Sequence, residues 1–325
     1  MRVHLRHRPE PDAMRSLEAA CRAAGDGPWH FTDGSEVPSD TDVLVAGRPT
    51  KEQLLASPHL RALVFPYAGL PPATRTLLLE VAPDLPVHNQ HHNAEAVAEA
   101  AVGLVFAAAK RVVPMDRALR AGDWRPRYAP DPAVRLGGKR ALVLGYGAVG
   151  RRVARMLRGL GLTVTATRRT GGLADENGIA VHPAADTLDL LASADILVLC
   201  LPGTPETTGL LDASALARLP HGALLVNIAR AAIVDEDALF DALQSGRLAG
   251  AGLDVWWRYP AADARHDTPP ATRPFHELDN LVMSPHRTGH GPWVEAARYR
   301  ELAATLVALA RGEEPASTVD VRAGY

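Results

Sequence analysis

The sequence predicts an α/β protein built on two parallel sheets, one of which is doubly wound. Short apolar runs that suit buried parallel strands alternate along the chain with amphipathic helical patterns. This alternation occurs in two separate blocks, and a chain of 325 residues is long enough for two domains. Because 47% of the residues are hydrophobic and 22% are charged, each block can bury a core, which excludes a disordered or fibrous chain.

The first block, residues 42–89, predicts a small parallel α/β unit. Its apolar β-type runs are separated by helical patterns, as in successive strand–helix–strand units. The expected strands are Asp42–Gly47, Leu63–Phe65 and Val87–Asn89.

A long alanine-rich helix is expected to begin at Ala94, and Pro114 should end or kink it. The stretch Arg111–Pro132 follows with four prolines and no clear periodicity. We therefore expect an extended arm there, of the kind that wraps a partner subunit.

The second block begins near Lys139 and alternates more regularly. A helix follows its first strand, because Val149, Val153 and Leu157 recur at helical spacing while arginines cover the opposite face. A last apolar helix, near Trp293–Ala310, should return to the first domain. The six expected strands, which together form one doubly wound sheet, are Ala141–Leu144, Thr163–Thr167, Ile196–Leu201, Leu224–Ile228, Ala251–Val255 and Leu281–Met283.

A Gly-x-Gly-x-x-Gly turn joins the first of these strands to the amphipathic helix. Gly145 permits the tight turn, Gly147 lets the backbone approach a pyrophosphate, and Gly150 allows close packing of helix on strand. The N–H groups of Ala148 and Val149, at the helix N-terminus, suit the anion. Alone the motif could be only a glycine-rich turn, but its position between strand and helix favours a Rossmann-type dinucleotide-binding domain.

The second strand of this block ends in Thr167, Arg168, Arg169 and Thr170. An NAD enzyme places an acid at this point against the ribose 2′-hydroxyl, and the sequence has none. Two guanidiniums and two hydroxyls suit a 2′-phosphate, so NADP(H) is the preferred cofactor and NAD(H) remains possible. The alternative is a solvated arginine pair at a strand end.

Three later strands end in side chains that suit hydride transfer to a 2-oxo acid. Arg230 follows the fourth strand, Asp254 ends the fifth, and His286 follows the sixth. The carboxyl ends of parallel strands form the edge where open α/β sheets bind ligands. Reduction of a 2-oxo acid needs a cation for the carboxylate and a proton donor for the developing alkoxide, which Arg230 and His286 could supply.

Over residues 42–294 the sequence resembles the D-2-hydroxyacid dehydrogenase family, which includes glyoxylate/hydroxypyruvate reductases and formate dehydrogenases. The resemblance implies a smaller, flavodoxin-like substrate domain of residues 1–95 and 288–325, into which a dinucleotide-binding domain of residues 96–287 is inserted. It also implies a homodimer. The matching motifs are Val97–Glu99, Gly122–Trp124, Leu136–Lys139, Leu201–Pro202, Glu206–Leu210, Asn227–Arg230, Leu253–Val255 and Pro285–His286.

The same resemblance implies roles for individual residues. Arg230 would orient the carboxylate and carbonyl of a small 2-oxo or 2-hydroxy acid, His286 would be the general acid/base, and Asp254 would lie near the nicotinamide carboxamide. Other residues implied to contact the cofactor are Leu201, Pro202, Thr207, Ile228 and Ala229. Residues implied to contact the substrate are Gly69, Leu70 and Asn93.

The sequence departs from the family pattern at three positions. Tyr259 stands where an acid usually pairs with the histidine, and a phenol stabilises an imidazolium less than a carboxylate does, so we expect His286 to titrate low. We keep Tyr259 among the candidate catalytic residues, although it could simply be packing beside tryptophans. Pro71 has no N–H to offer in the loop that holds the substrate carboxylate, which leaves more to Arg230. Ala231 replaces a glycine.

Composition excludes several kinds of partner. A net charge of −2 and a pI near 6.7 argue against nucleic acid and anionic membranes. Without a long apolar stretch or a secretory leader, the protein is expected in the cytoplasm. Cys21 and Cys200 suggest buried thiols rather than a disulfide or a metal site.

A histidine-rich segment precedes the long helix. His88, His91 and His92 have no cysteine or acid to complete a metal site, so a solvated helix entry is the better interpretation. Asn93 suits the N-cap of that helix, and it also matches a substrate-contacting asparagine of formate dehydrogenases.

Three functional hypotheses remain. The first is a reductase that passes hydride from NADPH to a small 2-oxo acid, with His286 protonating the oxygen. The second is formate-dehydrogenase-like oxidation, which needs no proton relay and is prompted by Tyr259, Asn93 and Leu70. The third is a catalytically silent NADP(H)-binding sensor or corepressor. Tyr259 and Pro71 favour it, whereas the retained Arg230 and His286 oppose it.

Overall fold

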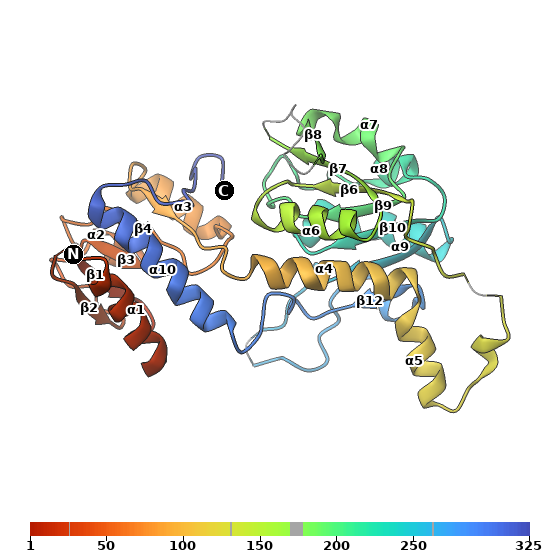
Figure 1. Cartoon of the computed structure of the whole chain (residues 1–325), viewed down its shortest axis with the longest axis horizontal. Coiled ribbons are helices and arrows are strands. Elements are labelled where there is room, and N and C mark those ends of the chain that lie inside the picture. Colours follow the sequence, from red (N-terminus) through yellow and green to blue (C-terminus); the bar gives the residue numbers. More distant parts are fainter. Residues whose placement is uncertain (26, 131, 170–177, 262) are drawn as a thin grey trace. The chain divides into compact units, whose positions relative to one another are not determined.

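The computed structural model describes residues 1–325 except 26, 131, 170–177 and 262 (Figure 1). The chain forms two compact units. One unit comprises residues 1–93 and 291–325, and the other comprises residues 94–290. The second unit is therefore a single continuous segment that interrupts the chain of the first.

The first unit is a five-stranded parallel sheet in the order β2-β1-β3-β4-β5. This is the strand order of flavodoxin-like folds, so the expected smaller α/β domain is confirmed. Its strands are β1 Arg2–Leu5, β2 His30–Asp33, β3 Val43–Val45, β4 Ala62–Val64 and β5 Val87–His88. Its helices are α1 Pro11–Ala23, α2 Lys51–Leu55, α3 Pro72–Val81 and α10 Val294–Arg311.

Apolar clusters cover both faces of this sheet. On one face Leu17 of α1 and Leu302 of α10 pack with Val3 and Val43. On the other face Leu78 of α3 packs in a second cluster with strand residues. Helix α10 thus returns to the first unit, as the sequence predicted.

Strands β1 and β2 were not expected, because polar residues interrupt the apolar pattern in both. In β1 the imidazole of His4 is buried, and its two nitrogens bond to Thr32 Oγ1 at 2.9 Å and to the Gly34 carbonyl at 3.1 Å. A polar side chain with both partners satisfied can occupy a core position. Strand β2 lies at the sheet edge and is mostly exposed, which leaves no apolar pattern to detect.

The second unit is a seven-stranded parallel sheet in the order β12-β11-β10-β9-β6-β7-β8. Counted within the unit, this is the doubly wound order 3-2-1-4-5-6 with one further strand, so the predicted Rossmann-type sheet is confirmed. Its strands are β6 Arg140–Leu144, β7 Thr163–Arg168, β8 Ala180–Pro183, β9 Ile196–Leu199, β10 Ala223–Asn227, β11 Leu248–Leu253 and β12 Leu281–Met283.

The expected count of six strands was wrong by one. Strand β8 is the seventh: it is short, lies at the edge and ends in Pro183. Only Val181 within it is buried, so it lacks the continuous apolar run by which the central strands were recognised.

Helices cover both faces of the second sheet. Helices α4 (Ala94–Ala109) and α6 (Ala148–Gly159) lie on one face, and Figure 1 shows them side by side. A Cβ on Gly252 would lie 2.8 Å from Leu104 Cβ, so this glycine allows α4 to sit close to β11. The other face is covered by α7 Thr187–Leu191, α8 Ala213–Arg218 and α9 Glu236–Gln244.

The arm expected over residues 111–132 contains helical structure, so the prediction of an extended segment was wrong. Helix α5 runs over Val112–Arg120, and a 3-10 turn, η1, runs over Arg125–Arg127. The break between α4 and α5 falls at Arg111, whose φ of 51° is left-handed. Pro114 lies in the first turn of α5, where its missing N–H leaves no helical bond unmade.

In the described part of the chain, no helix is long and apolar enough to cross a membrane. The same residues contain no group of three or more acidic, histidine or cysteine side chains that could hold a metal ion. Both cysteines, Cys21 and Cys200, are free thiols.

Candidate active site

The glycine turn after β6 has the geometry that its motif requires. Gly145 has φ 94°, and a Cβ there would lie 2.7 Å from the backbone of Leu201. A Cβ on Gly150 would come within 1.8 Å of the Gly145 carbonyl oxygen. Both positions therefore exclude any side chain, because backbone atoms fill the space on the protein side.

Gly147 differs from its two neighbours. It is the N-cap of α6 with φ −88°, which any residue can adopt, and a Cβ there would meet no described atom within 4 Å. A side chain at this point would project into open space beside the first N–H groups of the helix, at Ala148 and Val149, which have no partners inside the helix. The turn therefore fits a bound pyrophosphate, because the open space at Gly147 is where an anion would approach.

The end of β7 carries the arginines that the sequence assigned to a 2′-phosphate. Thr167 is buried, Arg168 is half-buried and Arg169 is exposed. The Arg168 Nε is buried and has no hydrogen-bond partner among the described residues. A buried donor without a partner is unfavourable, and a phosphate oxygen would satisfy it. Thr170 lies outside the described residues.

Asn227 fixes the turn that carries Arg230. Its Oδ1 accepts from the Ala229 N–H at 3.0 Å, and its Nδ2 donates to the Arg230 carbonyl at 3.0 Å. The Arg230 side chain then passes Gly203, where a Cβ would lie 2.8 Å from Arg230 Cγ. Arg230 is exposed and forms no ion pair with a described residue, so its charge is available to a ligand. Sequence reasoning gave no role to Asn227 or Gly203.

The loop after β9 is tied by Thr207. Its hydroxyl donates to the Pro202 carbonyl at 2.8 Å and accepts from the Thr204 N–H at 2.8 Å. Leu201 and Pro202 lie at the carboxyl end of the sheet, as do the buried Ile228 and Ala229. The structure thus gives Thr207 a part in shaping this loop, and its contact with a cofactor stays a prediction.

Asp254 anchors the segment that carries the histidine. It is 1% exposed, and Oδ1 accepts from Ser284 Oγ and, at 2.9 Å, from the Arg287 N–H. Oδ2 accepts from Thr288 N–H at 3.2 Å and from Thr288 Oγ1 at 2.5 Å. Four donors from one short segment satisfy this buried carboxylate, as burial of a charge requires. The polar residues on either side of Pro285-His286 were the only sequence signal for this arrangement.

His286 itself has left-handed backbone geometry, with φ 55°. Non-glycine residues adopt this conformation rarely, and the bonds to Asp254 on both sides of His286 hold it in place. Its Nδ1 lies 2.7 Å from the hydroxyl of Tyr259, which also accepts from the Trp256 N–H at 3.3 Å. The Trp256 indole donates to the Ser284 carbonyl at 2.8 Å and braces the same segment.

Burial lowers the pKa of His286 below its ordinary value, and the positive charges of Arg230 and His290 add to this. The negative charge of Asp254 acts in the opposite direction without cancelling the effect. The direction agrees with the sequence-based expectation, although desolvation rather than the lack of a carboxylate partner is the main cause. Burial raises the pKa of Tyr259, so its phenol is neutral at physiological pH.

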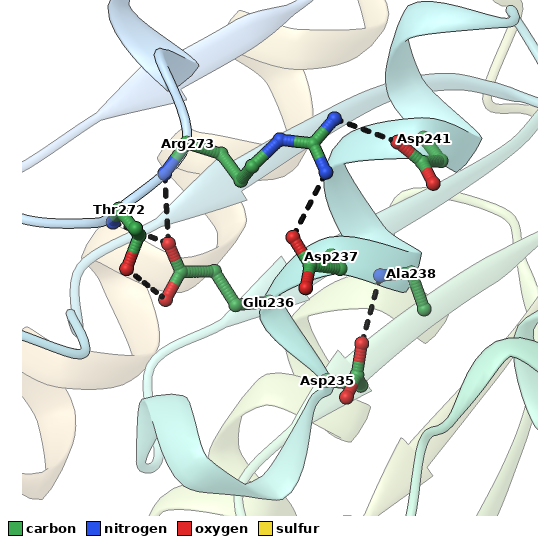
Figure 2. Close-up of polar contacts among 7 residues, drawn as sticks. All are labelled: Asp235, Glu236, Asp237, Ala238, Asp241, Thr272 and Arg273. Carbon is green, nitrogen blue, oxygen red and sulfur yellow. Dashed lines mark hydrogen bonds and ion pairs between the residues drawn. The ribbon is translucent and has the colours of Figure 1, made fainter.

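A clamp on α9 fixes the far end of the loop that carries Tyr259 (Figure 2). The guanidinium of Arg273 contacts Asp237 at 2.8 Å and Asp241 at 2.9 Å, while Glu236 accepts from the Arg273 N–H at 2.9 Å. Individual surface ion pairs contribute little, but several bonds to one residue restrict its position. The clamp therefore limits the freedom of the loop between β11 and the Arg273 contacts.

We expect Asp254→Asn to destabilise the second unit strongly. Both carboxylate oxygens of Asp254 accept hydrogen bonds. In asparagine one of these oxygens becomes an NH2 group, which is itself a donor, so the donors that now bond to that oxygen would lose their acceptor while still buried. The free energy of unfolding, measured by urea titration, should fall by about 3 kcal/mol. Asp189→Asn, which removes an exposed partner of Arg218, is the control and should change it by no more than about 1 kcal/mol. Equal effects of the two changes would contradict the anchoring role.

The remaining candidates belong to the first unit. Gly69 and Leu70 lie in the loop after β4, and Leu70 packs partly into the core. The loop is held by Asn89, whose Nδ2 donates to the Ala68 carbonyl at 2.7 Å. Asn93 immediately precedes α4. The roles of Gly69, Leu70 and Asn93 toward a substrate stay predictions.

The strand order, the glycine turn and the polar strand ends are those of a Rossmann-type dinucleotide-binding α/β protein. The family model described as D-isomer specific 2-hydroxyacid dehydrogenase, NAD binding domain, matches residues 102–288. The chain belongs to this family, as the sequence motifs had predicted.

Individual relatives agree. The chain is 33% identical over 232 residues to glyoxylate reductase of Korarchaeum cryptofilum, with 70% of this chain and 66% of that enzyme covered. It is 33% identical over 269 residues to D-3-phosphoglycerate dehydrogenase of Mycobacterium leprae, with 80% of this chain and 47% of that enzyme covered. The chain thus spans about half to two thirds of the length of these curated relatives.

A solved structure resembles the whole chain. The D-isomer specific 2-hydroxyacid dehydrogenase of Xanthobacter autotrophicus, in complex with NADPH and MES, superposes with a TM-score of 0.78 at 26% identity and covers 99% of each chain.

Proposed function

We propose that this protein reduces a small 2-oxo acid to the 2-hydroxy acid with a reduced nicotinamide cofactor. The observation that carries the proposal is that the glycine turn, Arg230 and His286 follow the carboxyl ends of β6, β10 and β12, which are every second strand along one parallel sheet. The reaction needs a cation for the substrate carboxylate, a proton donor for the carbonyl oxygen and a site for the cofactor phosphates. Arg230, His286 and the glycine turn could supply these in that order. Family membership supports the same conclusion.

In the proposed reaction each residue has a distinct task. A nicotinamide cofactor, when bound at the glycine turn, would supply the hydride. Arg230 pairs with the substrate carboxylate and polarises the carbonyl, because its guanidinium is exposed and has no competing carboxylate partner among the described residues. His286 gives a proton to the carbonyl oxygen, and Asp254 keeps His286 in its left-handed turn. The four hydrogen bonds that Asp254 accepts already explain why a carboxylate is buried at this position. A contact with the nicotinamide carboxamide is therefore not required to account for Asp254.

We propose further that residues 1–95 and 288–325 form the substrate domain. Backbone groups near Gly69 and Leu70 would face the substrate carboxylate, and Asn93 would be a further contact. Pro71 begins the turn before α3 without an N–H to give. The substrate carboxylate should therefore depend more on Arg230 than on this loop.

A homodimer is also part of the proposal. The segment over α5 and η1 exposes large apolar side chains, among them Trp124 at 61% and Tyr128 at 80% exposure, together with Val112 and Leu119. Helix α5 has no buried residue in this chain. Clustered exposed apolar residues favour a surface that a second copy covers.

The function is tested by mixing purified protein with NADPH or NADH and a panel of glyoxylate, hydroxypyruvate and phenylpyruvate. We expect oxidation of the cofactor with at least one of these acids. Reduction of NADP⁺ or NAD⁺ by formate, without turnover of the panel, would instead establish the formate-dehydrogenase-like alternative. Cofactor binding without turnover of either kind would indicate a silent sensor and would overturn the proposal.

Arg168 is expected to favour NADPH over NADH. The Arg168 Nε is buried and has no hydrogen-bond partner in the described part of the chain, and the cofactor of the Xanthobacter autotrophicus structure is NADPH. Arg168→Asp should raise the KM for NADPH by about 10- to 100-fold, because one or two charge-assisted hydrogen bonds to the 2′-phosphate are lost. The KM for NADH should stay within about threefold of the wild type. Arg155→Asp, an equal charge change on the exposed face of α6, is the control. Equal losses with both cofactors would refute the phosphate assignment.

A further inference from the structure

The direction of the hydrogen bond between Tyr259 and His286 can be deduced. A phenol has one hydrogen to donate, and the Tyr259 oxygen already accepts from the Trp256 N–H at 3.3 Å. Among the described residues, His286 Nδ1, 2.7 Å away, is the acceptor recorded for this hydrogen, so the phenol is assigned as the donor. No described carboxylate forms a hydrogen bond with this imidazole. Both oxygens of Asp254 accept instead from Ser284, Arg287 and Thr288.

This direction sets the tautomer. An Nδ1 that accepts a hydrogen bond carries no proton, so a neutral His286 holds its proton on Nε2. A carboxylate partner would do the opposite and accept from Nδ1–H, which favours the imidazolium. With Tyr259, protonation of Nδ1 would turn two donors toward each other and force the phenol hydrogen away.

We propose that Tyr259 is the proton source behind His286: the neutral imidazole gives its Nε2 proton to the substrate oxygen and takes the Tyr259 hydroxyl proton on Nδ1. This inference rests on the proposed reductase function. The substrate gains an O–H bond as the Nε2–H bond breaks, and an N–H bond forms at Nδ1 as the phenol O–H bond breaks. The electron pair of the reduction comes with the nicotinamide hydride, and solvent later returns a proton to the tyrosinate.

Some neighbouring groups stabilise the deprotonated form of Tyr259 and others destabilise it. The Trp256 N–H and the positive charge of Arg230 stabilise it, while burial and the negative charge of Asp254 oppose it. His286 is faced by Arg230, His290 and Asp254, and its pKa lies below the ordinary value, so imidazolium is scarce at neutral pH. Because a phenol is a much stronger acid than an alcohol, the net transfer from Tyr259 to an alkoxide is downhill.

The two possible proton sources predict different pH profiles. If imidazolium is the acid, the rate of reduction falls as the pH rises above a lowered histidine pKa, below about 6.5. If Tyr259 supplies the proton, the rate persists until the phenol ionises, above about 10.

The first experiment measures kcat for 2-oxo acid reduction from pH 5 to 10 in the wild type, Tyr259→Phe and Tyr259→Glu. We expect a flat wild-type profile to about pH 9, and for Tyr259→Phe a loss of about 100-fold at pH 9 but little change at pH 5.5. Tyr259→Glu should restore activity near neutral pH by raising the histidine pKa. Tyr299→Phe, on α10, is the control and should follow the wild type. A wild-type rate that falls in parallel with Tyr259→Phe above pH 7 would overturn the proposal.

The second experiment needs no turnover. The ¹⁵N resonances of His286, assigned by their loss in His286→Asn, should show an unprotonated Nδ1 and a protonated Nε2 in the wild type. In Tyr259→Phe this preference should weaken. A protonated Nδ1 in the wild-type neutral form would overturn the inference even if the protein is an active reductase. Absence of reductase activity together with the expected tautomer would count against the proposed function instead.

Discussion

Replacing His286 by asparagine is expected to lower kcat for 2-oxo acid reduction by about 10²- to 10⁴-fold, the usual contribution of a positioned acid–base group. Asparagine is chosen because it tolerates left-handed backbone better than most residues, and φ at this position is 55°. The bonds from Ser284 and Thr288 to Asp254 can then remain. The change thus removes the imidazole while sparing the turn that carries it.

A matched control separates this effect from a general loss of structure. His221→Asn changes an exposed histidine in the turn before β10 and should leave kcat and the melting temperature unchanged. The affinity of His286→Asn for NADPH, measured by fluorescence titration, should stay within about threefold of the wild type. Retention of full turnover by His286→Asn would show that another group protonates the substrate.

The second large effect is expected from a pair of glycine variants. A Cβ at Gly150 would lie 1.8 Å from a backbone oxygen, so Gly150→Ala must displace helix or strand. We expect destabilisation by about 2 kcal/mol, which lowers the melting temperature by several degrees, and loss of cofactor binding. A Cβ at Gly147 meets no described atom within 4 Å, so Gly147→Ala should leave the melting temperature unchanged.

The two variants differ in what they report. Gly147→Ala should still raise the Kd for NADPH by about 10- to 100-fold, because its methyl group would occupy the space that a pyrophosphate approaches. Thermal unfolding without ligand and equilibrium titration with NADPH measure the two quantities separately. Unchanged affinity in Gly147→Ala would mean that the dinucleotide does not bind at this turn.

The central strands were predictable because burial on both faces leaves a continuous apolar run, as in Ile196–Leu199 and Ala223–Asn227. Strands at an edge, such as β8, or built around a satisfied histidine, such as β1, lack that signal. Helix α5 was missed because none of its residues is buried in this chain and because the four prolines over residues 111–132 suggest an irregular segment.

The residues of the candidate site were predictable from the sequence, but their detailed geometry was not. Parallel strands end at a common edge, so the sequence could place Arg230 and His286 together, and the resemblance identified Tyr259 as the partner of the histidine. The left-handed turn at His286 and the four bonds to Asp254 could not be foreseen, because they depend on contacts between segments about 30 residues apart. They show Asp254 as the structural anchor of the candidate catalytic histidine.

The most direct test is calorimetric titration of the wild-type protein with NADPH and with NADH. Our interpretation predicts saturable binding of both cofactors at one site per chain, with a lower Kd for NADPH. No measurable heat with either cofactor, at concentrations up to the millimolar range, would contradict the assignment of the Gly145–Gly150 turn and with it the proposed reaction.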